Sequence, residues 1–193
     1  MDAVNRTFVG ILVPPTVASQ IEHGLLLLKR KPGVDNIRWS QPSEWLIQLA
    51  SLGELSPSTI SVLRQVLPPV AAKYPRLRLE VKGFSGSPNL IQPRYCHAEL
   101  QGDVEWLGQL AQAMEDAAAP FVPHRDVRGF RPHIVLGRLK TESEPLRVAL
   151  GRALKMTQAP EMGVIEANSV SLLVSHADEF HIGYAVSAEM PLG

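Results

Sequence analysis

The sequence predicts an α+β fold in which helices pack outside antiparallel or mixed sheets. Segments typical of strands and of helices follow one another in mixed order, with strand–helix units and strand pairs towards both ends of the chain. The 193 residues, 45% of them apolar, suit one domain or two small lobes that share a core. Because no low-complexity segment and no linker interrupts the chain, we expect a single bilobal domain over residues 1–193.

The first half of the chain predicts strands over residues 6–13, 45–49 and 77–81, and helices over residues 16–31 and 56–66. Pro14-Pro15 ends the first strand, and Pro32-Gly33 closes the first helix. Ser56-Pro57 suits the N-cap and first turn of the second helix. These signals delimit the elements, and the alternation of apolar and polar residues over 77–81 predicts a half-buried strand.

The second half predicts strands over residues 95–100, 132–138, 170–174 and 180–189, and helices over residues 103–119 and 143–156. Asp103 suits the N-cap of the first of these helices, which carries an apolar stripe that ends at Met114. Pro120 ends that helix. We expect residues 85–89, which are rich in turn formers, to lead into the strand at 95–100.

Composition and charge exclude several classes of protein. The 19 basic residues balance 19 acidic ones, which argues against a protein that coats duplex nucleic acid. The single cysteine, Cys96, excludes an intrachain disulfide and indicates a reducing, cytoplasmic setting. The longest apolar run, residues 25–28, is too short to span a membrane, and we expect no secretory signal, because no cationic start is followed by an apolar run. Phosphate-loop, dinucleotide and Ser-His-Asp signatures are missing, so no cofactor is expected.

Residues 130–138 (Phe-Arg-Pro-His-Ile-Val-Leu-Gly-Arg) predict a short strand that begins at a proline. Alternation points Ile134 towards a core and His133 and Val135 to the other face. Basic residues crowd around the strand: Arg125, Arg128, Arg131, Arg138 and Lys140. A histidine in such surroundings indicates an anion site, for example for a phosphate. The alternative is a polar strand end in a solvated basic patch, and this stretch alone favours the alternative.

Several segments together resemble the two-histidine phosphoesterases, and more specifically the bacterial RNA 2',3'-cyclic phosphodiesterases, also called 2'-5' RNA ligases. Residues 6–11 with Pro14-Pro15 resemble their opening strand, and residues 37–53 resemble the segment around their first catalytic motif. Residues 130–138 resemble the second motif. Residues 170–175 and Gly183-Tyr184 resemble the closing strand pair, so the likeness covers nearly the whole chain in order.

The resemblance implies two lobes of mostly antiparallel sheet, related by a pseudo-two-fold axis, with helices outside and a central cleft. Each lobe would contribute one His-x-Thr or His-x-Ser strand to that cleft. In-line opening of a cyclic phosphate needs a base on the entering water and an acid on the leaving oxygen, on opposite sides of phosphorus. Two facing histidines would supply both roles near neutral pH, and the hydroxyl groups would hold the phosphoryl oxygens.

The sequence departs from this pattern at the motif positions. Leu46 takes the first histidine position and Gln48 the first threonine position. His133 keeps the second histidine, while Val135 has nearly the shape of threonine without its hydroxyl group. A positioned acid or base is worth about 10²- to 10⁴-fold in rate. We therefore predict a catalytically degenerate member in which His133 is a remnant acid or base.

Other residues are candidates for the remaining roles. His97 shares a strand face with Tyr95 and Glu99 and is a candidate substitute base; the alternative is a partly exposed strand histidine. The Gln48 amide is a hydrogen-bond donor at the phosphate position, or a polar residue in an empty groove. Candidate phosphate partners are Arg131 and, with less support, Arg138. The alternative is that both are solvated surface arginines. Candidate cleft-lining residues are Phe8, Trp39, Leu46 and Val135, with core packing as the alternative for the two aromatic residues.

Three functions remain open. The first is a degenerate protein that binds a nucleotide or an RNA end with a terminal phosphate in the cleft. The second is an active cyclic phosphodiesterase in which His133 works with a substitute such as His97 or with substrate assistance. The third is a structural or partner-binding scaffold, for which the sequence names no protein partner. A metal site at His176 and His181 matches no standard ligand spacing, so we expect a polar hairpin tip there and no metal.

Overall fold

The computed structural model describes residues 6–123, 129–158, 160–177 and 182–193. Its strands are β1 (Thr7–Leu12), β2 (Ile37–Trp39), β3 (Leu46–Gly53), β4 (Leu77–Ser87), β5 (Tyr95–Gly102), β6 (His133–Leu139), β7 (Glu161–Ala167), β8 (Ser169–Ala177) and β9 (Ile182–Pro191). The α-helices are α1 (Pro15–Lys29), α2 (Pro57–Val66), α3 (Pro68–Ala71), α4 (Val104–Ala118) and α5 (Glu144–Met156). Two 3₁₀ turns are η1 (Pro42–Glu44) and η2 (Ala119–Phe121).

The strands form one antiparallel sheet in the order β7-β4-β5-β6-β3-β1-β8-β9, with β2 added beside β6. β3 and β6 meet in the middle, and each begins a set of four strands, β3-β1-β8-β9 on one side and β6-β5-β4-β7 on the other. The two middle strands pair through a single register contact, Ile47 with Ile134. The predicted α+β fold with two lobes around a centre is confirmed, and the lobes share one curved sheet.

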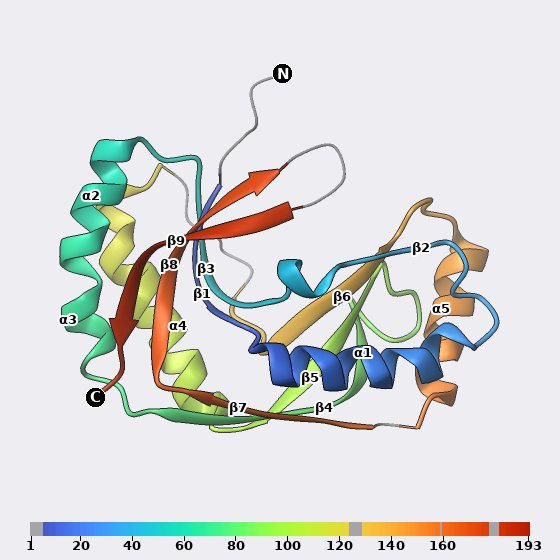
Figure 1. Cartoon of the computed structure of the whole chain (residues 1–193). Coiled ribbons are helices and arrows are strands. Elements are labelled where there is room, and N and C mark those ends of the chain that lie inside the picture. Colours follow the sequence, from blue (N-terminus) through green and yellow to red (C-terminus); the bar gives the residue numbers. More distant parts are fainter. Residues whose placement is uncertain (1–5, 124–128, 159, 178–181) are drawn as a thin grey trace.

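The helices fall into two groups, one for each lobe (Figure 1). α2, α3 and α4 pack against the lobe that contains β3 and β9, whereas α1 and α5 pack against the lobe that contains β7 and β4. Their apolar stripes cover one face of the sheet: Leu107, Leu110 and Met114 of α4 are fully buried, and so are Ile21 and Leu28 of α1. The polar residues discussed below line a cleft along the middle strands.

The predicted elements are found with several differences, and β2 and α3 are among the elements that were not predicted. β4 continues to Ser87, so residues 85–87, expected in a turn, belong to a strand. β7 was not predicted, and it pairs with β4 from Leu77↔Ala167 to Lys82↔Glu161. Asp103 stands at the N-cap of α4 without a side-chain cap bond, because its Oδ2 accepts from the backbone N–H of Arg78 at 2.8 Å. Ser56 caps α2 as expected, with its Oγ accepting from the Thr59 N–H at 3.1 Å.

Candidate functional site

The pairing of Ile47 with Ile134 fixes the geometry at the centre of the sheet. Both isoleucines are fully buried on the helix-covered face. Because side chains alternate along a strand, Leu46 and Gln48 point to the other face, as do His133 and Val135. The strands are antiparallel, so the register places Leu46 beside Val135 and Gln48 beside His133. The centre is therefore divided into an apolar pair and a polar pair.

These four side chains line a cleft of about 830 Å³ on the open face of the sheet. Its other lining residues come from both lobes: Glu44, Leu49, Ser51, Ser87, Pro88, Asn89, Gln92, Arg94, Tyr95, Glu115, Gly129, Phe130, Arg131, Arg147 and Tyr184. Leu46 is buried and packs over Gly10, where a Cβ atom would collide with the leucine side chain. Val135 is 38% exposed, so the apolar pair presents a hydrophobic floor rather than a hydrogen-bonding one.

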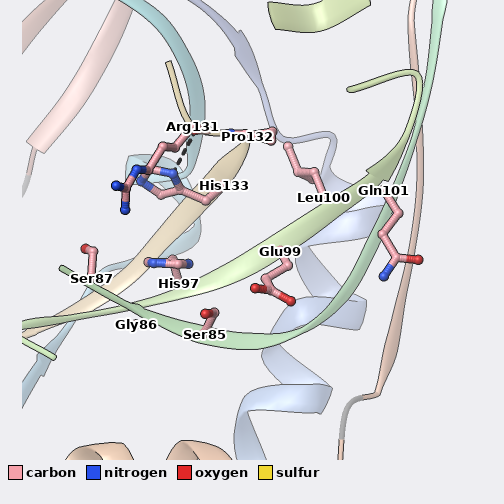
Figure 2. Close-up of a pocket in the computed structure, with 10 residues that line it drawn as sticks. All are labelled: Ser85, Gly86, Ser87, His97, Glu99, Leu100, Gln101, Arg131, Pro132 and His133. Atoms are coloured by element: carbon pink, nitrogen blue, oxygen red, sulfur yellow. Dashed lines mark hydrogen bonds between the residues drawn. The ribbon is translucent and has the colours of Figure 1, made fainter. Parts of the chain in front are cut away.

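His133 is held in one orientation by the backbone of the preceding segment. Its Nδ1 lies 2.8 Å from the carbonyl oxygen of Arg131, and because a carbonyl only accepts, Nδ1 carries the proton and donates (Figure 2). Burial lowers the pKa of His133, and the positive charge of Arg131 lowers it further, against an opposing effect of the backbone hydrogen bond. The neutral ring therefore offers Nε2 as its free acceptor at neutral pH.

His97 lies directly against His133. It sits on β5 opposite Val135, on the same open face, and the two imidazole centroids are 4.6 Å apart with the rings tilted by 41° (Figure 2). Only 9% of the residue is exposed, and its Nδ1 has no hydrogen-bond partner within the described part of the chain. Burial, followed by the charges of His133 and Arg131, lowers the pKa of His97 to about 4. His97 is therefore uncharged near neutral pH.

The two histidines border a second, smaller pocket of about 410 Å³ over β4 and β5 (Figure 2). Polar side chains from both strands line it, among them Ser85, Ser87, His97, Glu99 and Gln101. Ser87, Arg131 and His133 line both this pocket and the main cleft, so the two spaces adjoin.

The structure brings most of the predicted site residues together and leaves others apart. Gln48, Leu46, Val135, Arg131 and His133 line the main cleft, and His97 adjoins it.

Three predicted residues do not line either pocket. Arg138 lies near the far end of β6, opposite Arg38 of β2. Trp39 lies beneath the Nζ of Lys29, which is 5.3 Å from the ring centroid. Phe8 makes an edge-on contact with Tyr184, which does line the cleft, at 6.0 Å between centroids.

Part of the predicted basic cluster, Arg125 and Arg128, lies outside the described residues, as does His181 of the hairpin considered for a metal. No group of three or more histidine, cysteine or acidic side chains among the described residues is arranged to hold a metal ion. None of the helices in the described ranges combines the length and the apolar composition needed to cross a bilayer.

Sequence reasoning missed several residues of the site. Ser85 and Ser87 were assigned to a turn, and the length of β4 brings them to the pocket. Arg94 and Arg147 line the cleft from segments that are far apart in sequence, so no local pattern marks them. Tyr184 lies in the segment that resembles the closing strand pair, and that resemblance was the one signal available for it.

Known proteins resemble the chain over nearly its whole length. No protein-family model matches the chain. The RNA 2',3'-cyclic phosphodiesterase of Aquifex aeolicus (strain VF5) is 23% identical over 193 residues, which cover 98% of both chains. E. coli LigT, crystallised with 3'-AMP, superposes with a TM-score of 0.75 at 21% identity, covering 99% of each chain. A crystal structure described as a phosphoesterase superposes with a TM-score of 0.76 at 21% identity over 98% of each chain.

Proposed function

We propose that the chain is a member of the two-histidine phosphoesterase superfamily whose cleft binds nucleotides or RNA ends with a terminal phosphate and turns over 2',3'-cyclic phosphates slowly or not at all. The observation that carries the proposal is the division of the central strand pair. Gln48 and His133 form a polar pair, while Leu46 and Val135 place hydrocarbon where the family pattern has its first histidine and its second hydroxyl group. The site thus keeps hydrogen-bonding groups for a phosphate at the Gln48–His133 pair and lacks them at the Leu46–Val135 pair.

The apolar half explains the expected loss of turnover. In-line displacement at phosphorus needs an acid and a base on opposite sides, and each is worth about 10²- to 10⁴-fold in rate. Neither Leu46 nor Val135 can exchange a proton or donate a hydrogen bond to a phosphoryl oxygen. His133 alone can assist only one of the two proton transfers, so the missing partner limits hydrolysis.

The polar pair, Gln48 and His133, supports the proposal that the cleft still binds a phosphate. The Gln48 amide can donate a hydrogen bond beside His133, and Arg131 contributes a guanidinium group to the same end of the cleft. Binding of a phosphate also favours protonation of His133 at Nε2, which would add a charge-assisted hydrogen bond. These three groups come from two strands and one strand entry that the central register holds together.

The contact between His97 and His133 disfavours an active site in which both flank a phosphate. Ring centroids 4.6 Å apart are in van der Waals contact, so no phosphorus atom fits between the two rings. In-line chemistry places its acid and base on either side of phosphorus. His97 is better placed to tune the charge of His133 than to replace the missing histidine.

The test is titration calorimetry with adenosine 3'-monophosphate. We expect binding by the wild-type protein and a loss of roughly tenfold or more in affinity for His133→Ala, Gln48→Ala and Arg131→Gln, because hydrogen bonds to charged groups are worth about 1.5–3 kcal/mol. Arg138→Gln is the matched control: it removes the same charge at a position that does not line the cleft. A protein that does not bind, or an equal loss for Arg138→Gln, would contradict the proposal.

A further inference from the structure

The far end of the main cleft holds two arginines that the proposed phosphate site does not use. Arg94 precedes β5 and Arg147 lies on α5, and both line the same cleft as His133. Glu142 Oε2 is 3.2 Å from Arg94 Nε and 2.8 Å from Arg147 Nη2. Among the residues that the structure describes, the Glu142 carboxylate therefore serves both guanidinium groups, and both arginines remain part of the cleft lining.

Arg147 is also incompletely satisfied. Its side chain is 23% exposed, and its Nε is buried with no hydrogen-bond partner in the described ranges. A buried donor without an acceptor is unfavourable, so an anion that reached Nε would relieve that cost. The nearby carboxylate of Glu144 accepts from Gln92 Nε2 at 3.2 Å.

The two basic ends of the cleft are well separated. Glu99 of β5 is opposite His133, and Tyr95 of β5 is opposite Arg138. Five residues of β6, roughly 16 Å of extended strand, therefore separate the levels of His133 and Tyr95. A single phosphate group cannot reach both ends, and neither can two neighbouring phosphates, whereas phosphates two nucleotides apart in a polynucleotide can.

The surface between the two ends suits a base and a sugar. Val135 and Tyr95 point to the open face of the sheet and are 38% and 37% exposed. An exposed aromatic ring beside a basic groove is the arrangement on which single-stranded nucleic acids stack their bases. The acidic lining residues, Glu44 and Glu115, come from the other lobe, so the arginine side of the cleft is the side favourable to phosphate.

We propose that Arg94, Arg147 and Tyr95 form a second subsite for the penultimate nucleotide of single-stranded RNA. The two arginines bind its backbone phosphate and Tyr95 stacks on its base. The inference rests on the proposed function, which places the terminal phosphate at His133. It makes the preferred ligand an oligonucleotide end and not a mononucleotide.

The experiment measures affinities for a trinucleotide with a 3'-phosphate, for adenosine 3'-monophosphate and for adenosine 3',5'-bisphosphate. We expect the trinucleotide to bind at least tenfold more tightly than either mononucleotide, with a salt dependence steeper by about 0.7 in log–log slope for the added phosphate contact. Arg94→Gln, Arg147→Gln and Tyr95→Leu should each weaken trinucleotide binding about tenfold and leave adenosine 3'-monophosphate within twofold. Arg147→Lys, which keeps the charge, should retain part of the affinity.

Arg152→Gln is the matched control, because Arg152 is an exposed arginine of α5 that does not line the cleft. The second subsite is overturned if the mononucleotide binds but the trinucleotide gains nothing, or if the arginine variants behave like Arg152→Gln. It is also overturned if adenosine 3',5'-bisphosphate binds as tightly as the trinucleotide, because one nucleoside would then fill both ends. If wild type binds none of the ligands, the proposed function fails together with the subsite.

Discussion

His97 introduces an uncharged imidazole into the polar face of the sheet. It is nearly buried, its ring contacts His133, and Arg131 and Glu99 line the same pocket. Burial and the neighbouring positive charges lower its pKa to about 4, while an unfolded chain would titrate near 6.5. Between these two values the unfolded state binds more protons than the folded state, so the free energy of unfolding falls as the pH is lowered through this window.

We expect this histidine to make the protein acid-sensitive. When the pH is lowered from 7 to 4, the titration of His97 should reduce the free energy of unfolding by about 2 to 3 kcal/mol, because one pKa unit corresponds to about 1.4 kcal/mol. His97→Gln removes the titrating group, so its urea midpoint should depend less on pH. His23→Gln, at an exposed position of α1, is the control and should follow wild type. A His97→Gln variant with the same acid sensitivity as wild type would contradict the pKa assignment.

At the residue scale, alternation along strands predicted much of the cleft. It placed His133 and Val135 on one face and set His97 on one face of its own strand with Tyr95 and Glu99, whereas the position of Gln48 came from the resemblance to the first motif. Alternation failed beyond Leu136, because Leu136 and Gly137 are both buried and the strand register shifts at Cys96/His97. Arg138 is exposed and pairs with Tyr95, and it lines neither pocket.

At the element scale, the site depends on how tightly β3 and β6 are joined. Ile47 and Ile134 are fully buried at their single register contact. We expect Ile134→Val to lower the free energy of unfolding by about 0.5–1.5 kcal/mol, since it removes one buried methylene group. Val135→Thr, the adjacent and exposed position, should change it by less than about 0.5 kcal/mol. If Ile134→Val and Val135→Thr lowered the free energy of unfolding in urea equally, the Ile47–Ile134 pair would not be what stabilises the contact between β3 and β6.

Element boundaries were predictable where turn residues mark them. Ser56-Pro57 predicted the start of α2, and the structure adds the cap bond from the Thr59 N–H. β7 was missed because Gly163 interrupts its apolar pattern, and the strand is stabilised by pairing with β4, which a local pattern cannot reveal. Asp103 was assigned as a helix cap, but the carboxylate accepts from the Arg78 N–H, a partner brought in by tertiary structure.

At the scale of the whole molecule, one sheet runs through both lobes, and we propose that the chain is one domain. Trp39 lies in β2 beside β6, whereas Trp106 lies on α4 against the other lobe. Urea unfolding of Trp39→Phe and Trp106→Phe, followed by fluorescence, should therefore give coincident midpoints after correction for each variant's stability by circular dichroism. Separate fluorescence transitions would indicate lobes that unfold independently.

The topology could not be derived from local patterns alone. β3 and β6 are neighbours although about 80 residues separate them, and non-local pairing of this kind leaves no signal in periodicity. The resemblance to two-histidine phosphoesterases supplied the arrangement of the lobes, and the strand order confirms it. The positions of Arg94 and Arg147 could not be predicted from local patterns either, because Arg147 reaches the cleft only through the placement of α5.

The most direct test of the central claim is the turnover of a 2',3'-cyclic nucleotide by wild type, compared with His133→Ala and with the triple variant Leu46→His/Gln48→Thr/Val135→Thr. We expect wild type and His133→Ala to differ little, both far below the triple variant, which regains the acid–base pair and both hydroxyl groups and should gain at least about 10²-fold. Robust wild-type turnover that His133→Ala abolishes would contradict the claim that the apolar half of the cleft has removed efficient catalysis.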